Sequence, residues 1–294
     1  LARAGVGHLR IIDRDFVEES NLQRQILFDE ADAAGRLPKA VAAERKLKQI
    51  NSSIKVEGIV ADAQANNIEE LVSGFDLTLD GADNFDTRFL LNDAAVKLNL
   101  PWIYGAVVAS YAVTLTVLPG RTACLSCVLP QTPEGIHETC DTVGVIGPAV
   151  AWVTSIQVAE ALKILCGRTD VLHGKLITYD VWSNRLQQVA PSRDPACRTC
   201  GQHEFAYLEG ESPTHLSMCG RGSVQIHQRK SRHIDLEALK NRLAQFGPVR
   251  ANTFLVQCTL DPYELTVFQD GRAIIKGTQD AAVARSLYAR YIGS

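Results

Sequence analysis

Residues 9–25 of this 294-residue chain read LRIIDRDFVEESNLQRQ, an apolar run followed directly by acids, amides and guanidinium groups. The first four residues have the character of a short buried strand. Asp13 ends this strand, where a carboxylate can hold the hydroxyls of a nucleotide ribose. Asn21, Arg24 and the later Lys39 are the groups that a site needs to neutralise a triphosphate in the transition state. The stretch favours ATP chemistry over hydride transfer, and the competing interpretation is a solvated surface loop.

Strand and helix patterns alternate through roughly the first 165 residues. Strands are expected at residues 56–60, 77–79, 102–107 and 113–118, and helices at residues 39–50 and from 84 to about 98. This alternation predicts an α/β fold with a mostly parallel, Rossmann-like sheet and helices on both faces. Residues 145–166 are apolar on nearly every side, which is typical of a helix in a large core or an interface, and either suits a homodimer.

The first seven residues read as the end of a helix, with a glycine stop leading into a strand. A nucleotide-binding α/β unit needs a strand and a glycine-rich turn before such a helix. We therefore expect a chain that is truncated at its N-terminus, lacks the first strand and the glycine loop, and binds ATP poorly by itself.

The composition narrows the classes of partner and compartment. A formal charge of −3 gives no sign of nucleic-acid binding. No apolar stretch reaches the ~20 residues needed to cross a bilayer, and no signal peptide is recognised. Eight cysteines, four of them in two C-x-x-C pairs, suit a reducing cytoplasm better than a secreted disulfide scaffold.

The two C-x-x-C pairs predict a metal site. Cys124 and Cys127 form the first pair, and Cys197 and Cys200 form the second. Four thiolates at such spacing fit a closed, tetrahedral Zn²⁺ site, which is structural because no position is left for water or substrate. The alternative is two unrelated redox or core cysteine pairs.

Two further residues are candidates for chemistry. Asp83 follows the strand expected at residues 77–79 and could hold Mg²⁺ against phosphate oxygens, although it or Asn84 could simply cap the next helix. Cys140 precedes the apolar helix, whose dipole would favour a thiolate, with His137 as a possible base. Against a reactive role, buried cysteines are usually inert.

The character of the chain changes near Phe205. Asp235 can cap a helix, and Asp270-Gly271 lies between two apolar runs as a hairpin turn. We expect two domains, residues 1–204 with the nucleotide and zinc motifs, and residues 205–294 as a small C-terminal α/β module.

These motifs resemble those of the HesA/MoeB/ThiF family, the ubiquitin-activating-enzyme-like adenylyltransferases of small sulfur-carrier proteins. The resemblance covers about residues 1–204, and the C-terminal module is a weaker match to an extension in one bacterial subgroup. The matching motifs are Asp13-Arg14-Asp15, residues 20–25, Pro38-Lys39, Asp80 to Asn84 with Arg88 and Asn92, both C-x-x-C pairs and Thr139-Cys140.

The resemblance implies a reaction and a role for each residue. The family's enzymes use ATP to adenylate the C-terminal Gly-Gly carboxylate of the carrier, and sulfur then replaces AMP for thiamine or molybdopterin synthesis. Asp13 would hold the ribose, Asn21, Arg24 and Lys39 the phosphates, and Asp83 Mg²⁺. Cys140 matches the cysteine that forms a covalent link with the carrier in some members.

The implied partners are a ThiS- or MoaD-like carrier, a second copy of the chain, and a sulfurtransferase or cysteine desulfurase. Two alternatives stay open. A nicotinamide or flavin oxidoreductase would share the alternating fold but leaves Asn21, Arg24, Lys39 and the cysteine pairs unexplained. A truncated, non-catalytic dimerisation scaffold is the second.

Overall fold

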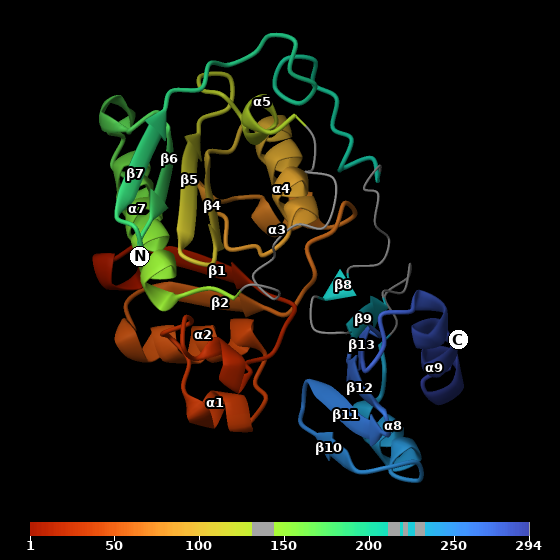
Figure 1. Cartoon of the computed structure of the whole chain (residues 1–294). Helices are drawn as coiled ribbons and strands as arrows, with labels where there is room; N and C mark the ends of the chain where they lie inside the picture. The colour runs from red at the N-terminus through yellow and green to blue at the C-terminus, as the bar shows by residue number, and fades with distance from the viewer. Residues whose placement is uncertain (131–143, 211–217, 220–222, 227–232, 294) are drawn as a thin grey trace. The chain divides into compact units, whose positions relative to one another are not determined.

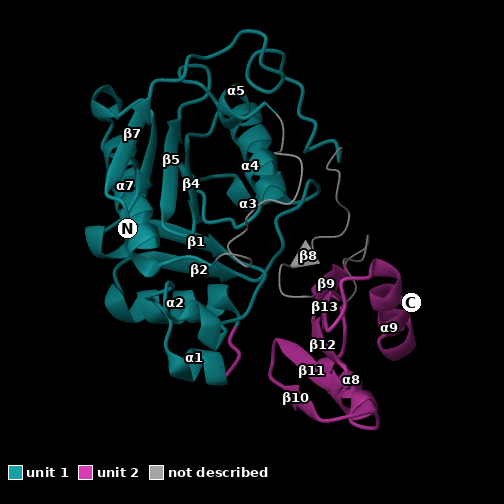
Figure 2. Ribbon diagram, viewed as in Figure 1, with its two compact units in different colours: residues 1–34, 38–212 teal, residues 35–37, 213–294 magenta. Residues whose placement is uncertain are grey.

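The computed structural model describes residues 1–130, 144–210, 218–219, 223–226 and 233–293 (Figure 1). The chain divides into two compact units (Figure 2). Unit 1 contains residues 1–34 and 38–212, and unit 2 contains residues 35–37 and 213–294. The assignment of an adenylation domain to residues 1–204 and of a separate module to residues 205–294 stays a prediction.

Unit 1 begins with a small parallel sheet. Its elements are the 3₁₀ turn η1 Ala2–Ala4, the strand β1 His8–Ile12, the turn η2 Glu19–Asn21, the helices α1 Glu30–Ala34 and α2 Lys39–Ile50, and the strand β2 Lys55–Ile59. Gly5 ends the first turn with a φ of 80°, as the glycine stop in the sequence predicts. The strands β1 and β2 pair in parallel, with Leu9 opposite Val56.

Helix α2 packs very closely on β2. A Cβ atom at Gly58 would lie 2.3 Å from the carbonyl oxygen of Ala40, so only glycine allows this approach. The buried residues of α2 are correspondingly small: Ala40, Ala42 and Ala43. This contact fixes the start of α2 relative to the sheet.

The second sheet of unit 1 has five strands in sequence order. They are β3 Thr78–Leu79, β4 Trp102–Val108, β5 Tyr111–Val117, β6 Leu176–Asp180 and β7 Arg185–Val189. The predicted α/β class is confirmed, but the sheet is mixed rather than mostly parallel. Only β3 and β4 pair in parallel here, and the following pairs are antiparallel. The cause is local: Ala109 and Ser110 alone join β4 to β5, and a parallel pair needs a crossover of a dozen or more residues.

Helices cover both faces of this sheet, as predicted. The remaining helical segments among the described residues of unit 1 are α3 Ile68–Val72, α4 Phe85–Lys97, α5 Leu125–Val128, α7 Gly147–Leu165 and η3 Thr169–Val171. Helix α4 packs on the face that carries Trp102 and Leu115. Helix α7 packs on the opposite face, where Val153 contacts the region of Ala112. Among the described helices, none combines the length and apolarity of a membrane span.

Helix α7 is buried along one side only. Ala149, Val153 and Gln157 face the sheet, whereas Thr154 and Ser155 are exposed. An almost wholly apolar helix thus keeps one face open to solvent within a single chain.

The described residues of unit 2 form an antiparallel sheet with two helices on one face. Its strands are β8 Met218–Cys219, β9 Ser223–Ile226, β10 Val249–Ala251, β11 Leu255–Leu260, β12 Tyr263–Phe268 and β13 Ala273–Lys276, and its helices are α8 Leu236–Leu243 and α9 Ala281–Tyr291. The strand order is β10-β11-β12-β13-β9-β8. The predicted Asp235 cap and the hairpin turn at Gly271 are both confirmed. Leu239 and Tyr288 join the two helices to one apolar core.

Candidate functional site

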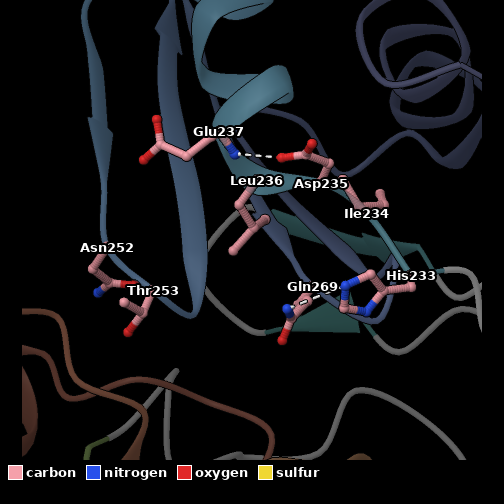
Figure 3. Close-up of a pocket in the computed structure, with 8 residues that line it drawn as sticks. All are labelled: His233, Ile234, Asp235, Leu236, Glu237, Asn252, Thr253 and Gln269. Atoms are coloured by element: carbon pink, nitrogen blue, oxygen red, sulfur yellow. Dashed lines mark hydrogen bonds between the residues drawn. The ribbon is translucent and has the colours of Figure 1, made fainter.

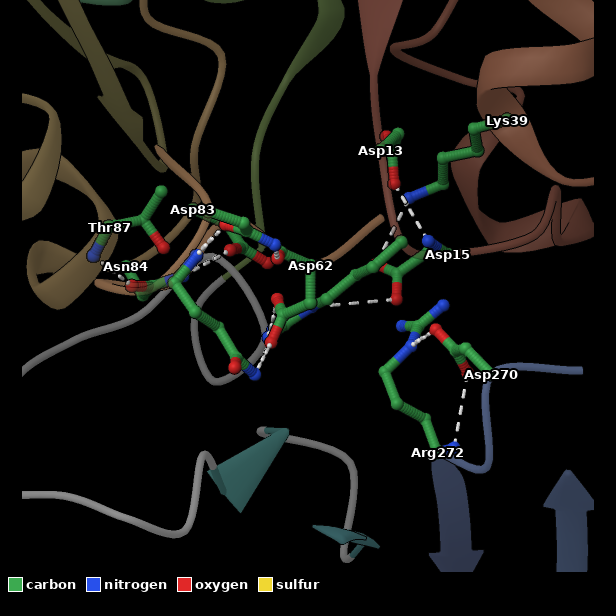
Figure 4. Close-up of polar contacts among 12 residues, drawn as sticks. Asp13, Asp15, Lys39, Asp62, Asp83, Asn84, Thr87, Asp270 and Arg272 are labelled. Carbon is green, nitrogen blue, oxygen red and sulfur yellow. Dashed lines mark hydrogen bonds and ion pairs between the residues drawn. The ribbon is translucent and has the colours of Figure 1, made fainter. Parts of the chain in front are cut away.

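Asp13 directly follows β1 and is held by the backbone around it. Its own N–H donates to the carbonyl of Ile59 at 3.2 Å, which continues the pairing with β2. The N–H of Asp15 donates to Oδ1 of Asp13 at 2.8 Å. The carboxylate therefore has a fixed direction at the end of the strand, as the sequence predicts (Figure 4).

Lys39 reaches the same place from α2. As the first residue of the helix, it donates its backbone N–H to the carbonyl of Asp15 at 2.8 Å. Its Nζ lies 3.5 Å from Oδ2 of Asp15, and its side chain is only 14% exposed. The helix start thus holds an ammonium group beside two acids (Figure 4).

The charges of Asp13, Asp15, Lys39 and Asp83 act on one another. Burial raises the pKa of Asp13 to about 6, with Lys39 lowering it and the carboxylates of Asp15 and Asp83 raising it further. Burial alone would lower the pKa of Lys39, but attraction to the same three carboxylates outweighs it and raises that pKa. The four side chains form one electrostatic group, which we call the charged edge.

Asp83 joins the charged edge from the start of α4. Asn84 caps this helix, because its Oδ1 accepts the N–H of Thr87 at 2.8 Å, and its Nδ2 lies 3.1 Å from Oδ1 of Asp83. Burial tends to raise the pKa of Asp83, but the bond from Asn84 and the charges of Arg14 and Lys39 lower it. The pKa of Asp83 is therefore shifted in the opposite direction to that of Asp13, and Asn84 rather than Asp83 caps the helix.

Arg14 is a second cation at this edge, to which the sequence analysis gave no role. Its guanidinium donates to Oδ1 of Asp62 at 2.9 Å, and Gln64 donates to the other oxygen of that carboxylate at 2.9 Å. Arg14 also lowers the pKa of Asp83. The feature of the sequence that could have indicated this role is the position of Arg14 between Asp13 and Asp15.

A buried ion pair supports the loop that carries Asp83. Asp80 and Arg88 form an ion pair at 3.2 Å with side chains 0% and 7% exposed. Burial raises the pKa of Asp80 and Arg88 opposes it. Gln157 of α7 donates to the carbonyl of Asp80 at 2.9 Å, and it lies so close to Gly105 that a Cβ there would come within 2.5 Å of its amide nitrogen.

Two other predicted residues make contacts within their own segment, and the rest lie outside the described residues. Asn21 is buried and its Oδ1 accepts the N–H of Glu18 at 3.2 Å, so part of its amide holds the η2 turn. Arg24 donates to the carbonyl of Ser20 at 2.7 Å and is not among the leading charges that shift the pKa values of Asp13 or Asp83. Cys140 lies outside the described residues, as does His137.

The four predicted metal-ligand cysteines come together in a second cluster. Their sulfur atoms all lie within 4.8 Å of one another. Three separations are 3.9 Å for Cys124 to Cys127, 3.7 Å for Cys124 to Cys197 and 3.4 Å for Cys127 to Cys200. A tetrahedral Zn²⁺ with bonds of about 2.3 Å requires sulfurs about 3.8 Å apart, so the cluster fits that ion.

The electrostatics of the cysteine cluster also fit a cation. Burial, followed by the neighbouring thiols, raises the pKa of Cys124. Burial and the thiol of Cys127 raise the pKa of Cys200 to about 11. A positive ion is what would allow these sulfurs to be thiolates at neutral pH.

Unit 2 has an open cavity of about 580 Å³ (Figure 3). Its polar groups serve local structure: Asp235 caps α8, and Gln269 lies 3.4 Å from a ring nitrogen of His233. We assign it no catalytic role. The lining residues are His233, Ile234, Asp235, Leu236, Glu237, Asn252, Thr253 and Gln269.

The fold and the two clusters of unit 1 define a class: a Rossmann-like α/β protein with a charged edge of the nucleotide-binding type and a four-cysteine metal cluster. Residues 1–199 match the model of the ThiF family. Over 297 aligned positions, which cover 100% of this chain and 88% of the relative, the chain is 47% identical to the sulfur carrier protein ThiS adenylyltransferase of Bacillus subtilis (strain 168).

Two other comparisons agree. The chain is 36% identical over 203 residues to the SAMP-activating enzyme E1 of Haloferax volcanii, with 69% of this chain and 74% of the relative covered. A crystal structure of E. coli MccB with MccA-N7isoASN matches with a TM-score of 0.60 and 25% identity, over 68% of this chain and 61% of that chain. The chain belongs to the ThiF family, and the resemblance stated from its motifs is confirmed.

Proposed function

We propose that this chain catalyses the ATP-dependent adenylation of the C-terminal Gly-Gly carboxylate of a small, ubiquitin-like sulfur carrier. The observation that carries the proposal is the charged edge, in which Asp13, Lys39 and Asp83 interact electrostatically at the ends of strands. The names of the relatives support it, since one is a sulfur carrier protein ThiS adenylyltransferase and the other a SAMP-activating enzyme E1.

Three residues of the charged edge have separate tasks in this proposal. The oriented carboxylate of Asp13 accepts the ribose hydroxyls of ATP. The ammonium group of Lys39 contacts the phosphates, and Asp83, whose pKa is lowered, offers an ionised oxygen to Mg²⁺. When bound, Mg²⁺ supplies positive charge to the phosphate oxygens.

The chemistry asks for positioning and positive charge rather than for a base. The carrier carboxylate is already ionised at neutral pH, and one of its oxygens attacks the α-phosphorus of ATP. The bond to the bridging oxygen breaks, its electron pair leaves with pyrophosphate, and the acyl-adenylate remains. The obstacle is the approach of one anion to another, which Lys39 offsets by lying beside the reacting groups.

The remaining predicted residues extend this proposal. Asn21 contacts the phosphates from the η2 turn and Arg24 from the residues that follow it; Arg24 donates from Nη1 to the carbonyl of Ser20, and its other guanidinium N–H groups can donate to a phosphate oxygen. Cys140 forms a covalent link with the activated carrier. These roles rest on the family motifs that the residues match.

The proposed partners follow from the same reasoning. The 47% identity to an enzyme named for ThiS favours a ThiS-type carrier and hence thiamine synthesis over molybdopterin synthesis. The exposed side of the apolar helix α7 supports a homodimer. We place the protein in the cytoplasm, where a sulfurtransferase or cysteine desulfurase could supply the sulfur and where free thiols persist.

The test is pyrophosphate exchange into ATP in the presence of a purified carrier. Because weak ATP binding is expected of the 294-residue chain by itself, the assay is run at saturating ATP, where exchange should occur with the intact carrier and not with a carrier that lacks the two glycines. Lys39→Ala should lower the rate about 100- to 1000-fold, since it removes a charge aimed at the transition state. Lys48→Ala is the matched control, because Lys48 lies on the same helix and pairs with Glu44 at the surface.

The control variant should change the rate by less than about twofold, as exposed ion pairs contribute little. An equal loss in both variants would contradict the role of Lys39. A folded, zinc-containing chain with no exchange would favour the non-catalytic scaffold instead.

A further inference from the structure

Two consecutive residues of α4 reach the two halves of the cysteine cluster. Asn92 accepts the N–H of Leu125 at 2.9 Å and donates to the hydroxyl of Ser126 at 3.2 Å. Asp93 accepts the hydroxyl of Thr199 at 3.1 Å and the N–H of Tyr207 at 2.9 Å. Asn92 therefore holds the first C-x-x-C turn, and Asp93 holds the second.

The two hydroxyls also contact each other. Ser126 precedes Cys127 and Thr199 precedes Cys200, so they occupy equivalent positions in their turns. Their oxygens lie 3.0 Å apart. Asn92 and Asp93 are joined by a peptide bond. With the contacts above, they therefore close a ring that attaches both cysteine turns to one point on α4.

Apolar packing reinforces this attachment. The rings of Phe89 and Tyr207 stack with their centres 5.1 Å apart. Phe89 and Leu90 share one buried cluster with Cys124 and Cys200. The metal cluster and the middle of α4 thus belong to one packed core, which leaves α4 little freedom to shift relative to the cluster.

The other end of α4 belongs to the charged edge. The helix has 13 residues and is therefore about 20 Å long. Asn84 caps it beside Asp83, and Arg88 anchors its first turns to Asp80 and to the carbonyl of Ala82 at 2.6 Å. Arg88 and Asn92 are four residues apart, so both anchors lie on the same side of the helix.

We propose that Asn92, Asp93, Ser126 and Thr199 are positioning residues. They make α4 a rigid connection between the cysteine cluster and the charged edge. Loss of the hydroxyl bridge loosens the N-terminal turn of α4 and the Asp80–Asn84 loop, and so displaces Asp83. The expected effect on ATP binding rests on the proposed function, whereas the rigid connection through α4 does not.

The variant that tests the bridge is Thr199→Val, which keeps the shape of the side chain and removes the hydroxyl. Thr199→Ser restores it, and Thr154→Val is the matched control, because Thr154 is exposed on α7 and bonds only within its own helix. Zinc affinity, measured by competition with a chromogenic chelator, should fall about 10- to 100-fold in Thr199→Val alone.

Hydrogen exchange of the zinc-loaded proteins separates positioning from a purely structural role. In Thr199→Val, amides of residues 80–88 should exchange at least about tenfold faster, whereas α9 in unit 2 should be unchanged. Thr199→Ser should recover the slow exchange. Faster exchange confined to residues 124–127 and 197–200 would overturn the proposal, as would equal effects from Thr154→Val.

Nucleotide binding provides the final measurement. The dissociation constant for ATP with Mg²⁺ should rise about 2- to 30-fold in Thr199→Val and stay near the wild-type value in Thr199→Ser. An unchanged constant would overturn the link to the charged edge. If the wild-type chain shows no carrier-dependent exchange, the proposed function fails, while hydrogen exchange still decides whether α4 forms the connection.

Discussion

The cysteine cluster is attached to the middle of α4 and the charged edge lies at its N-terminal end, and the two differ in how their polar groups are paired. Cys124 and Cys200 are buried, and the four sulfurs of the cluster lie within 4.8 Å of one another, as ligands of one tetrahedral ion would. The acids of the charged edge keep partial exposure, and their pKa values are shifted in opposite directions, upward for Asp13 and downward for Asp83. The cysteine cluster is closed and needs only a metal ion. The charged edge is open, and its acids differ in how readily they ionise, as a site for a charged ligand requires.

The largest effect is expected at the closed site. Cys124→Ser should abolish stoichiometric zinc binding and lower the free energy of unfolding of unit 1 by several kcal/mol, because structural zinc binds small peptides with about 10–16 kcal/mol. Metal analysis and thermal unfolding measure both effects. Cys166→Ser is the control, since Cys166 is exposed and outside the cluster. A Cys124→Ser protein with full zinc content would contradict a four-sulfur site.

An intermediate effect is expected at the open site when the pH is changed. The pKa of Asp13 is raised from 3.8 to about 6, so between these values the folded protein holds a proton that the unfolded chain has released. Ionisation of Asp13 therefore lowers stability as the pH rises through this window. Asp13→Asn should raise the midpoint of thermal unfolding at pH 7.5 and leave it unchanged near pH 4.

Nucleotide affinity should depend on pH in the opposite sense. The ionised carboxylate accepts both ribose hydroxyls, so wild-type affinity for ATP should fall about tenfold from pH 7 to pH 5 as Asp13 takes up its proton. Asp13→Asn should bind weakly at both values. Calorimetry gives the constants, and a pH dependence that persists in the variant would assign the proton to another group.

The smallest effect separates the charged edge from ordinary helix capping. Asn84→Ala and Asp280→Ala each remove an N-cap, one from α4 and the other from α9 in unit 2. Each should cost about 1 kcal/mol of stability in its own unit. Only Asn84→Ala should also weaken ATP binding, by a few-fold, because Asn84 bonds Asp83. Equal binding by both variants would make the cap purely structural.

The sequence predicted the elements of this fold better than their pairing. Helix Lys39–Ile50, the Asn84 and Asp235 caps and the hairpin at Gly271 all depend on local patterns and are confirmed. The direction of β5 depends on the two-residue connection from β4. The alternation of apolar segments in the sequence does not distinguish such a hairpin from a crossover to a parallel strand. The predicted mostly parallel sheet was wrong for this reason.

The candidate site shows the same division. Asp13, Arg24, Lys39 and Asp83 were predicted to line one nucleotide site. The charges of Asp13, Lys39 and Asp83 act on one another, whereas the described contact of Arg24 is to the carbonyl of Ser20. Gln157 was not predicted, since its bond to the Asp80 carbonyl depends on how α7 packs against β4. Arg14 was quoted without a role, because its partner Asp62 is distant in sequence. The four cysteines needed only their spacing, and the role of Cys140 stays a prediction.

The close contact at Gly58 has a consequence for how this enzyme could change. The place of the Lys39 ammonium group is set partly by a residue that carries no functional group, because any side chain there would push the helix outward from Ala40. Such a change would move the cation without altering a single charged residue. A related protein could therefore lose activity through substitution of this glycine while it keeps every residue of the charged edge.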